Sequence, residues 1–279
     1  MAHCLNEPRG APDRWLPYDA VEANMDTSAI LDRDEWVLNG RKQFISSGYD
    51  ATLYVVYANT DDTAPMSRGT SSFLVARETP GLEVTRCNET IGGPFMNNGE
   101  IAFHDCRVPA DHLLVHHDAL AQASIYFRPG KVLVAAKSLG IGVGACEETV
   151  RFVHSRLQGA RAHRASGGGL TCGRHGHEAR GRGGPAAPRG PGGRRALGGR
   201  RRVVQHGQVL RLHEVVTVCQ NAMELHGGYG AMLDVGVETY MRDALISLHS
   251  DGTTDVSNFK IVKAMFPATA GRYAVEGSS

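Results

Sequence analysis

The amino-acid sequence predicts an α+β fold, with a central antiparallel β barrel or sandwich followed by a C-terminal helical bundle. Three observations carry this prediction. Short strand-like runs fill residues 35–109, apolar residues recur at helical spacing from Gly130 onward, and an Arg/Gly-rich segment interrupts the helical part. We therefore expect a β domain at 1–115, bundle helices at 116–157 and 214–279, and a disordered segment at 158–213.

The β domain is predicted from runs rich in β-branched and aromatic residues that alternate with turn residues. These runs are WVLNG, KQFISS, LYVVYA, SSFLVA, LEVTR and GEIAFHDCRV. Glycine, asparagine, aspartate and proline stand between them, which favours many short antiparallel strands.

The first bundle helix is predicted over Gly130–Arg156, where apolar residues are spaced three and four apart. It contains GIGVG, Gly140–Gly144, which lacks the preceding strand and the full spacing of a phosphate-binding loop. These glycines indicate close helix packing instead. Further helices are predicted at Val215–Leu225 and Val235–Leu248, with HGGYG as the break between them.

The segment Gly159–Arg202 holds 11 of the 30 basic residues, one of the 29 acidic residues and 14 glycines. It has too few large aliphatic residues to build a core. A disordered basic linker and an RNA-gripping Arg/Gly segment are both open interpretations, although the aromatic residues that stack on bases are missing. Nucleic-acid binding is not expected of the protein as a whole, because the basic surface belongs to this one segment.

The remaining composition bounds the class of protein. No apolar run reaches the roughly 18 residues of a membrane helix, and MAHCLNEPRG has no signal-peptide core, so we expect a cytoplasmic protein. The six cysteines form no C-x-x-C pair, so we expect reduced, mostly buried thiols and no metal site.

Six motifs, in this order, resemble the acyl-CoA dehydrogenase family: CLNEP, WVLNGRKQFISSG, FHDCRVPADHLL, FRPGK, NAMELHGGYG and YMRDALISLHSDGT. The resemblance implies an N-terminal helical domain, here absent, then a β domain and a helical bundle. It also implies FAD, an acyl-CoA thioester substrate, an electron-transfer flavoprotein as acceptor, a homodimer or homotetramer, and a role in fatty acid metabolism.

The resemblance places Asn6, in the strand that usually reads Thr-Glu-Pro, beside the flavin ring. It also places Phe44 against the ring and the Ser46 hydroxyl near flavin N5. The alternative is an ordinary strand with alternating core and surface residues. Pro12 departs from the family pattern and removes an N–H and a hydroxyl from the substrate side.

The resemblance assigns Arg156, Gly227 and Gly228 to the diphosphate of a neighbouring subunit's FAD, because an arginine fork and glycine amides suit phosphate oxygens. Glu224 stands where glutamine is usual, near the adenine or ribose. The alternatives are a solvated helix-end charge for the arginine and a plain helix terminus for the glycines.

Asp251 occupies the family's catalytic-base position, where glutamate is more common; its local pattern is also that of a plain Asp-Gly turn. The acid that some branches carry on the first long helix is replaced by Phe127. The resemblance further implies cofactor contacts from Thr253 and Asp255, and substrate contacts from Arg128 and Gly252.

The function implied is FAD-dependent α,β-dehydrogenation of an acyl-CoA thioester. Two alternatives stay open: a noncatalytic fragment of the same family, and an RNA-binding or scaffold protein that uses the Arg/Gly segment. The resemblance stops after RFVHSR and resumes at EVVTVCQ, so we also predict that Leu157 to about His213 comes from a shifted reading frame.

Overall fold

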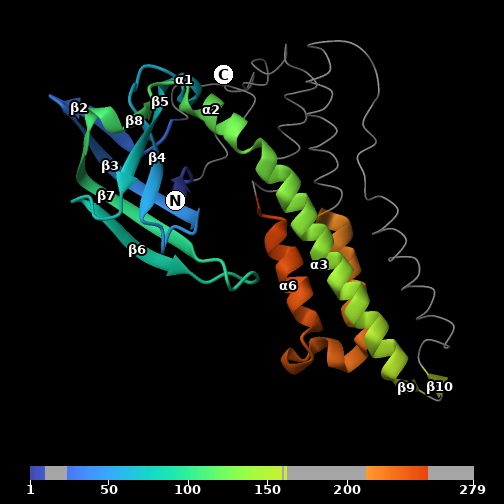
Figure 1. The fold of residues 1–279 in the computed structure, drawn as a ribbon. Coiled ribbons are helices and arrows are strands. Elements are labelled where there is room, and N and C mark those ends of the chain that lie inside the picture. The colour runs from blue at the N-terminus through green and yellow to red at the C-terminus, as the bar shows by residue number, and fades with distance from the viewer. Residues whose placement is uncertain (10–23, 159, 162–211, 251–279) are drawn as a thin grey trace, which may run out of the picture. The chain divides into compact units, whose positions relative to one another are not determined.

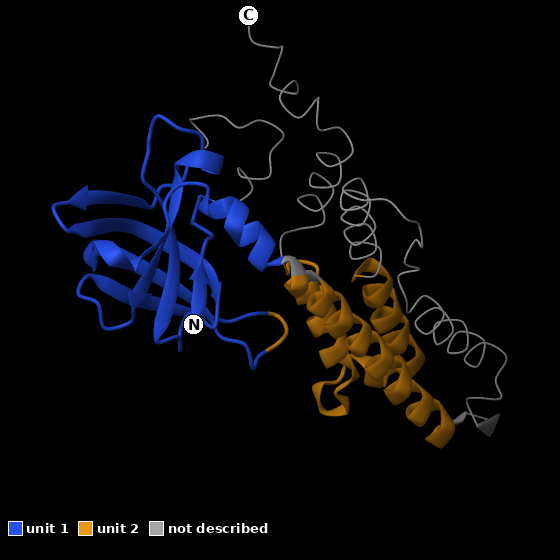
Figure 2. Cartoon of the chain, turned by 45° about the horizontal axis from the view of Figure 1, so that its top comes forward, with its two compact units in different colours: residues 1–90, 94–128, 266–279 blue, residues 91–93, 129–265 orange. Residues whose placement is uncertain are grey.

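The computed structural model describes residues 1–9, 24–158, 160–161 and 212–250. The chain divides into two compact units, coloured separately in Figure 2. Among the described residues, unit 1 holds 1–90 and 94–128, and unit 2 holds 91–93 and the residues from 129 onward. The finer division at 115, 157 and 213 stays a prediction.

Unit 1 is built on one sheet of eight strands, in the order β6-β7-β3-β2-β4-β5-β8 with β1 on β4 (Figure 1). The strands are β1 Ala2–Cys4, β2 Ser28–Asp32, β3 Glu35–Ser46, β4 Leu53–Asn59, β5 Thr70–Ala76, β6 Leu82–Asn88, β7 Asn98–Pro109 and β8 Leu113–Val115. The six predicted runs lie in five strands, because WVLNG and KQFISS are parts of the single strand β3. The sheet is not wholly antiparallel, because β1 and the start of β2 both pair with β4 in parallel.

Short helices complete unit 1: α1 Met66–Gly69, a 3-10 turn at Ala110–His112, and α2 Ala119–Tyr126.

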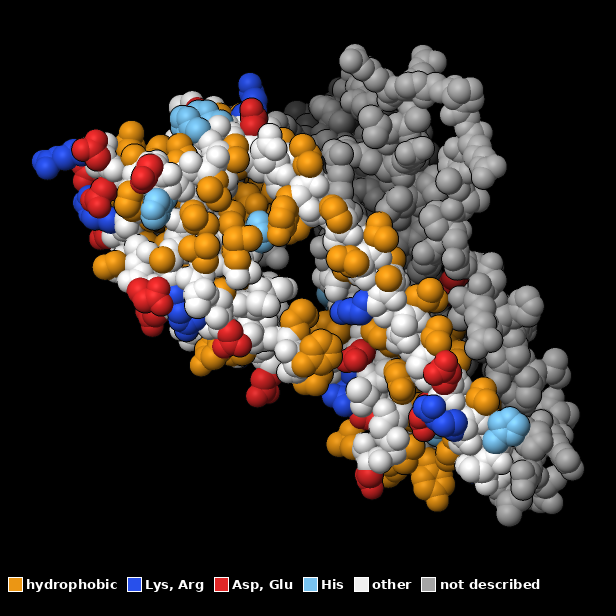
Figure 3. Space-filling view, in the orientation of Figure 1, with side chains coloured by type: hydrophobic (Ala, Val, Ile, Leu, Met, Phe, Trp, Pro, Cys, Tyr) orange, Lys and Arg blue, Asp and Glu red, His pale blue; other side chains and the backbone are white. Residues whose placement is uncertain are grey.

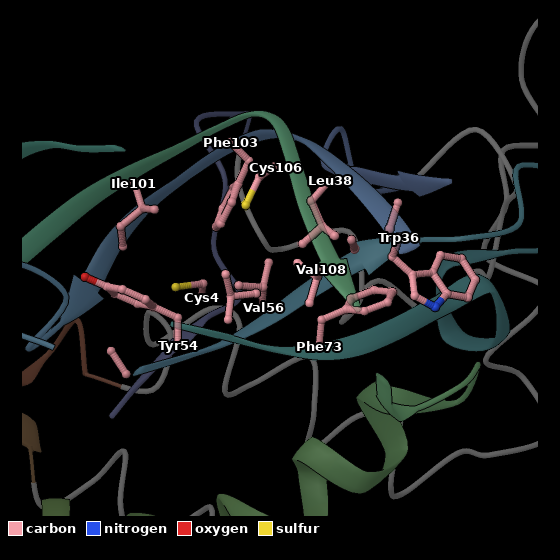
Figure 4. Close-up of a cluster of buried hydrophobic side chains, with 14 of the residues drawn as sticks. Cys4, Trp36, Leu38, Tyr54, Val56, Phe73, Ile101, Phe103, Cys106 and Val108 are labelled. Carbon is pink, nitrogen blue, oxygen red and sulfur yellow. The ribbon is translucent and has the colours of Figure 1, made fainter. Parts of the chain in front are cut away.

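The core of unit 1 lies where β1, β3, β4, β5 and β7 turn their side chains inward, as Figure 4 shows for Tyr54, Phe73 and Phe103. All three side chains are essentially inaccessible to solvent, and the Tyr54 hydroxyl donates to the Gly48 carbonyl at 2.9 Å. Burial of each large side chain contributes roughly 1.5–3 kcal/mol.

Unit 2 is helical, as predicted. Its described elements are α3 Arg128–Ser155, the helical residues 212–226, 3-10 turns at Gly227–Ala231 and Leu233–Val235, and α6 Val237–Ser247. The short strands β9 Leu157–Gln158 and β10 Ala160–Arg161 follow α3. A second core joins these helices through Ala145, Val215, Cys219, Ala222 and Val237.

The glycines of GIGVG lie inside α3, where they allow helices to approach closely, as predicted. A Cβ at Gly144 would lie 2.6 Å from Cε1 of Tyr240 on α6, and one at Gly142 would lie 3.5 Å from a methyl of Val215. At Gly140 a Cβ would meet nothing within 4 Å. Two of the three glycines therefore serve the packing of unit 2.

Four further findings bear on the class of protein. Within the described ranges, no helix is long and apolar enough to cross a membrane, and no group of three or more ligating side chains is placed to hold a metal. The five described cysteines are free thiols; Cys4, Cys106 and Cys219 are buried, and Cys87 is exposed. On the face shown in Figure 3, acidic and basic side chains are interspersed. The Arg/Gly segment lies almost wholly outside the described residues.

Candidate functional site

The residues predicted to face the flavin ring lie on two neighbouring backbone segments of unit 1. The chain around Asn6 runs beside β3, where the Gln43 amide donates to the Asn6 carbonyl at 3.0 Å. The Gln43 side chain donates to the Glu7 carbonyl at 3.1 Å. The structure thus brings Asn6 to the strand that carries Phe44 and Ser46, as the motifs predict.

A bulge in β3 decides which way these side chains point. Lys42 pairs with Ile101 and Ile45 with Gly99, so β3 has one more residue than β7 between these two pairs. Phe44 lies inside the bulge at φ +57°, a backbone conformation that is unusual for an aromatic residue.

The bulge changes the alternation of buried and exposed side chains along the strand. Trp36, Leu38 and Lys42 are buried before it, whereas Ile45 is buried after it. Phe44 is consequently 56% exposed, and Ser46 is exposed on the same strand end. An exposed ring and an exposed hydroxyl, two residues apart, are suited to contact a planar ligand.

A buried ion pair joins two neighbours of this group in the chain, because Glu7 follows Asn6 and Lys42 precedes Phe44 by two residues. The Lys42 ammonium contacts the Glu7 carboxylate at 2.7 Å, and the two side chains are 0% and 4% exposed. The same carboxylate accepts the backbone amides of Asp26 at 2.7 Å and Thr27 at 3.0 Å. Burial would raise the pKa of Glu7, but the Lys42 charge and the hydrogen bonds from Lys42, Thr27 and Asp26 outweigh it and hold that pKa below its ordinary value.

A second group of predicted residues lies in unit 2, where the helical residues 212–226 end. Gly227 has φ +59°, and the Arg156 guanidinium donates to the carbonyl of His226 at 3.2 Å. A Cβ at Gly227 would lie 3.6 Å from the same guanidinium nitrogen, and one at Gly228 would meet nothing within 4 Å. The Arg156 guanidinium therefore lies beside Gly227, and the space that a side chain at Gly228 would occupy is open.

Two aromatic side chains that the sequence did not single out support this group. Phe152 stacks on the His226 ring with centroids 4.1 Å apart, and the Arg156 guanidinium lies 5.4 Å from the Phe152 ring. The His226 ring is fully buried, and its Nδ1 donates to the Ala222 carbonyl at 2.7 Å. The four-residue spacing of Phe152 and Arg156 was the available signal, since it places both side chains on one helix face.

The polar residues of α6 hold the loop 91–93 within unit 2. The Gly93 amide donates to the Asp243 carboxylate at 2.6 Å, and Arg242 pairs with Glu238 at 2.8 Å. A Cβ at Gly92 would collide with the Arg242 carbonyl. This helix ends at Ser247, four residues before the predicted base.

The other predicted residues have mixed outcomes. Glu224 is exposed on the last turns of the helical residues 212–226, and Arg128 is the first residue of α3, two residues before the predicted start at Gly130. The catalytic and loop residues lie outside the described residues, so their roles stay predictions: Asp251, Gly252, Thr253 and Asp255.

Both groups have the chemistry that a flavin dinucleotide requires. Arg156 supplies a positive fork, and Gly227 and Gly228 are exposed and carry no side chain, so a diphosphate could approach their backbone closely. Phe44 and Ser46 supply an aromatic face and a hydroxyl for a ring system. The residues present therefore fit the cofactor implied by the motifs.

Comparison with known proteins identifies the two domains. The model of the acyl-CoA dehydrogenase middle domain matches residues 18–106, and that of the acyl-CoA dehydrogenase C-terminal domain matches residues 210–266. Together the two matches cover slightly more than half of the chain.

Similar individual proteins cover nearly the whole chain. An acryloyl-CoA reductase (NADH) of Anaerotignum propionicum is 29% identical over 94% of this chain and 65% of its own length. An acyl-CoA dehydrogenase of Bacillus subtilis is 26% identical over 96% of this chain and 69% of its own length. The crystal structure of an acyl-CoA dehydrogenase from Geobacillus kaustophilus superposes with a TM-score of 0.80 at 25% identity, over 95% of this chain and 68% of that one.

The chain thus spans about two thirds of the length of the relatives it matches. Its β-sheet domain and its helical domain each match their own family model, in the order that the motifs predict. By fold and by sequence, the chain belongs to the acyl-CoA dehydrogenase family.

Proposed function

We propose that this chain binds FAD and takes part in the α,β-dehydrogenation of an acyl-CoA thioester. The observation that supports this most directly is the approach of Arg156 to the left-handed Gly227 at the end of a helix. An arginine fork beside exposed glycines, which let a ligand approach the backbone closely, suits a diphosphate with negative charge on several oxygens. When bound, FAD supplies the acceptor for a hydride from the substrate β-carbon.

The remaining roles in the proposal belong to this chain's own residues. Phe44 packs on the flavin ring, the Ser46 hydroxyl bonds its N5 edge, and Asn6 contacts the ring from the neighbouring segment. Asp251 removes the α-proton of the thioester, which requires a carboxylate shielded from water so that its basicity is raised. Thr253, Asp255 and Glu224 complete the cofactor contacts, and Arg128 and Gly252 face the substrate.

The proposal includes an oligomer, because Arg156 and the Gly227 turn serve the cofactor of an adjoining subunit. The acceptor of the electrons is an electron-transfer flavoprotein. Purified chain should elute from a sizing column as a dimer or larger species that absorbs as a flavoprotein. A monomer that keeps stoichiometric flavin would refute the shared site.

Arg156→Gln tests the diphosphate site, with Arg151→Gln as its matched control. Arg151 lies on α3, five residues before Arg156, and its exposed side chain pairs with Glu148. We expect Arg156→Gln to weaken FAD binding by about tenfold to a hundredfold, the loss of one or two charge-assisted hydrogen bonds. Arg151→Gln should bind FAD as the wild type does, and equal losses in both variants would contradict the assignment.

Anaerobic mixing with straight, branched and alicyclic acyl-CoA thioesters tests the chemistry. Asp251→Asn should retain FAD and lose the bleaching of flavin absorbance that thioesters cause. Undiminished bleaching in that variant would return Asp251 to the plain-turn interpretation. Flavin binding without bleaching by any thioester, in the wild-type chain, would favour the noncatalytic alternative.

A further inference from the structure

We propose that the buried Glu7–Lys42 ion pair is a positioning device, which fixes Asn6 against the β3 bulge and so sets the geometry of Phe44 at the flavin ring. The proposal rests on the proposed function for its ligand. Its structural part, the hold on Asn6 and Phe44, stands on the geometry of unit 1 alone.

The ion pair flanks the only described backbone link between the two segments. Glu7 follows Asn6 directly, and Lys42 precedes Gln43 directly, while the Gln43 amide donates to the Asn6 carbonyl at 3.0 Å. The Gln43 side chain adds a second bond, to the Glu7 carbonyl at 3.1 Å. A 2.7 Å contact between the neighbouring side chains therefore locks the register of this link.

The link matters because the sheet does not support this part of β3 by itself. The pairing of β3 with β7 shifts register between Lys42 and Ile45, so the extra residue of the bulge falls at Gln43 or Phe44. A bulge leaves its extra residue outside the regular ladder. The Gln43 amide donates to Asn6 instead of to β7. The Glu7–Lys42 ion pair therefore supplies the constraint on the backbone here that pairing with β7 does not.

Phe44 needs such a constraint. Its φ of +57° is a strained conformation for an aromatic residue, and its ring is 56% exposed, so core packing does not hold it. Strained backbone conformations persist only where the surrounding structure over-determines them, and they concentrate at functional sites.

The charge of the pair is itself informative. Lys42 and Glu7 are buried with their partners satisfied: the carboxylate accepts the ammonium and two backbone amides, from Asp26 and Thr27. A buried ion pair gives little or no net stability over an apolar pair of similar volume, because both ions lose their hydration. Stability therefore does not explain its presence, whereas a fixed geometry does.

Three variants test the proposal in the full chain: Glu7→Gln, Lys42→Met, and the two combined. The combined variant removes both charges, so its resistance to urea should recover relative to either single variant. The hold on Asn6 and Phe44 should stay lost in the combined variant even though its resistance to urea recovers. Arg107→Gln is the matched control, because Arg107 pairs with Asp32 and Glu35 on the same sheet but is half exposed.

The first measurement is hydrogen exchange of the Gln43 amide without flavin. We expect about tenfold faster exchange in the combined variant, because the link to Asn6 opens locally, and unchanged exchange at Val56 in β4. The second measurement is the visible spectrum and reduction potential of bound flavin, which should shift in the combined variant and not in Arg107→Gln.

The outcomes separate the two ideas. Wild-type exchange at Gln43 in the combined variant would overturn the positioning role, whatever the flavin does. Faster exchange at Gln43 in a chain that binds no flavin would refute the proposed function and uphold the hold on Asn6. Faster exchange with an unchanged flavin spectrum and potential would overturn the link between the pair and the cofactor.

Discussion

The three glycines of GIGVG offer a substitution series on one helix with opposite expected signs. Replacing glycine by alanine inside a helix stabilises the folded state by about 1 kcal/mol, because the unfolded chain loses less freedom. A Cβ at Gly140 meets nothing within 4 Å, so Gly140→Ala should show this gain undiminished. Gly142→Ala should show it too, since its Cβ would lie at ordinary contact distance, 3.5 Å, from Val215.

Gly144→Ala should differ, because its Cβ would lie 2.6 Å from Cε1 and 3.3 Å from Cζ of the half-buried Tyr240 ring. Relief requires the ring or the helix to move, and overpacking of this kind costs about 1–3 kcal/mol. Set against the helical gain, the net change for Gly144→Ala is a loss of about 0–2 kcal/mol. Gly140→Ala and Gly144→Ala should therefore differ by about 1–3 kcal/mol.

Urea unfolding followed by far-UV circular dichroism measures the difference, since unit 2 supplies most of the described helix. Gly144→Ala combined with Tyr240→Leu should regain most of the loss, because the ring that meets the new methyl group is gone. Equal stabilities for Gly140→Ala and Gly144→Ala would refute the close approach of α3 and α6. The result also distinguishes the two interpretations of GIGVG. If the glycines served to bind phosphate and not to pack helices, the effect of Gly144→Ala on stability would not depend on Tyr240.

Three further predictions follow from the structure. Folding lowers the pKa of Glu7, so the stability that its charge contributes is complete above the ordinary carboxyl pKa of about 4.3 and is lost as the pH falls through the lowered value. In urea titrations at a series of acidic pH values, Glu7→Gln should make the fall in stability with decreasing pH less steep. An unchanged fall in that variant would contradict this prediction. Phe44→Gly should raise the free energy of unfolding by about 1 kcal/mol, because glycine relieves the strain of the left-handed backbone, and it should also weaken flavin binding. A variant that unfolds at a lower urea concentration than the wild type would show that the Phe44 ring packs more than its exposure indicates. Sequencing the DNA that encodes Leu157–His213 should reveal an alternative frame with two amphipathic helices, and if neither frame encodes them the Arg/Gly segment is a genuine feature.

Sequence patterns predicted the elements of this fold better than their pairing. The runs WVLNG and KQFISS, rich in β-branched and aromatic residues, predicted the strand residues of β3, and the spacing of three and four predicted α3, because both patterns are local. The parallel pairing of β1 with β4 was missed, since it joins residues about 50 positions apart with no local turn between them. Strand partners of this kind depend on long-range packing.

The motifs predicted part of the placement of the candidate-site residues, whose roles stay proposals. Motifs identified Arg156 and Gly227, which the structure brings together. They did not identify the Glu7–Lys42 pair, although the alternation from Leu38 already places Lys42 on the inner face and so signals a buried charge that needs a partner. The bulge was missed because it depends on the length of β7 as much as on β3.

The bulge makes the number of residues in β3 as informative as their identity. A substitution at Gln43 leaves the count intact, so Phe44 and Ser46 stay on the open side of the sheet and Ile45 stays in the core. Deleting one residue there would restore regular pairing with β7 and reverse the facing of everything downstream, since side chains alternate with a period of two. When this strand is aligned with those of other chains, a single-residue gap between Lys42 and Ile45 therefore signals a different surface, even where every aligned residue is identical.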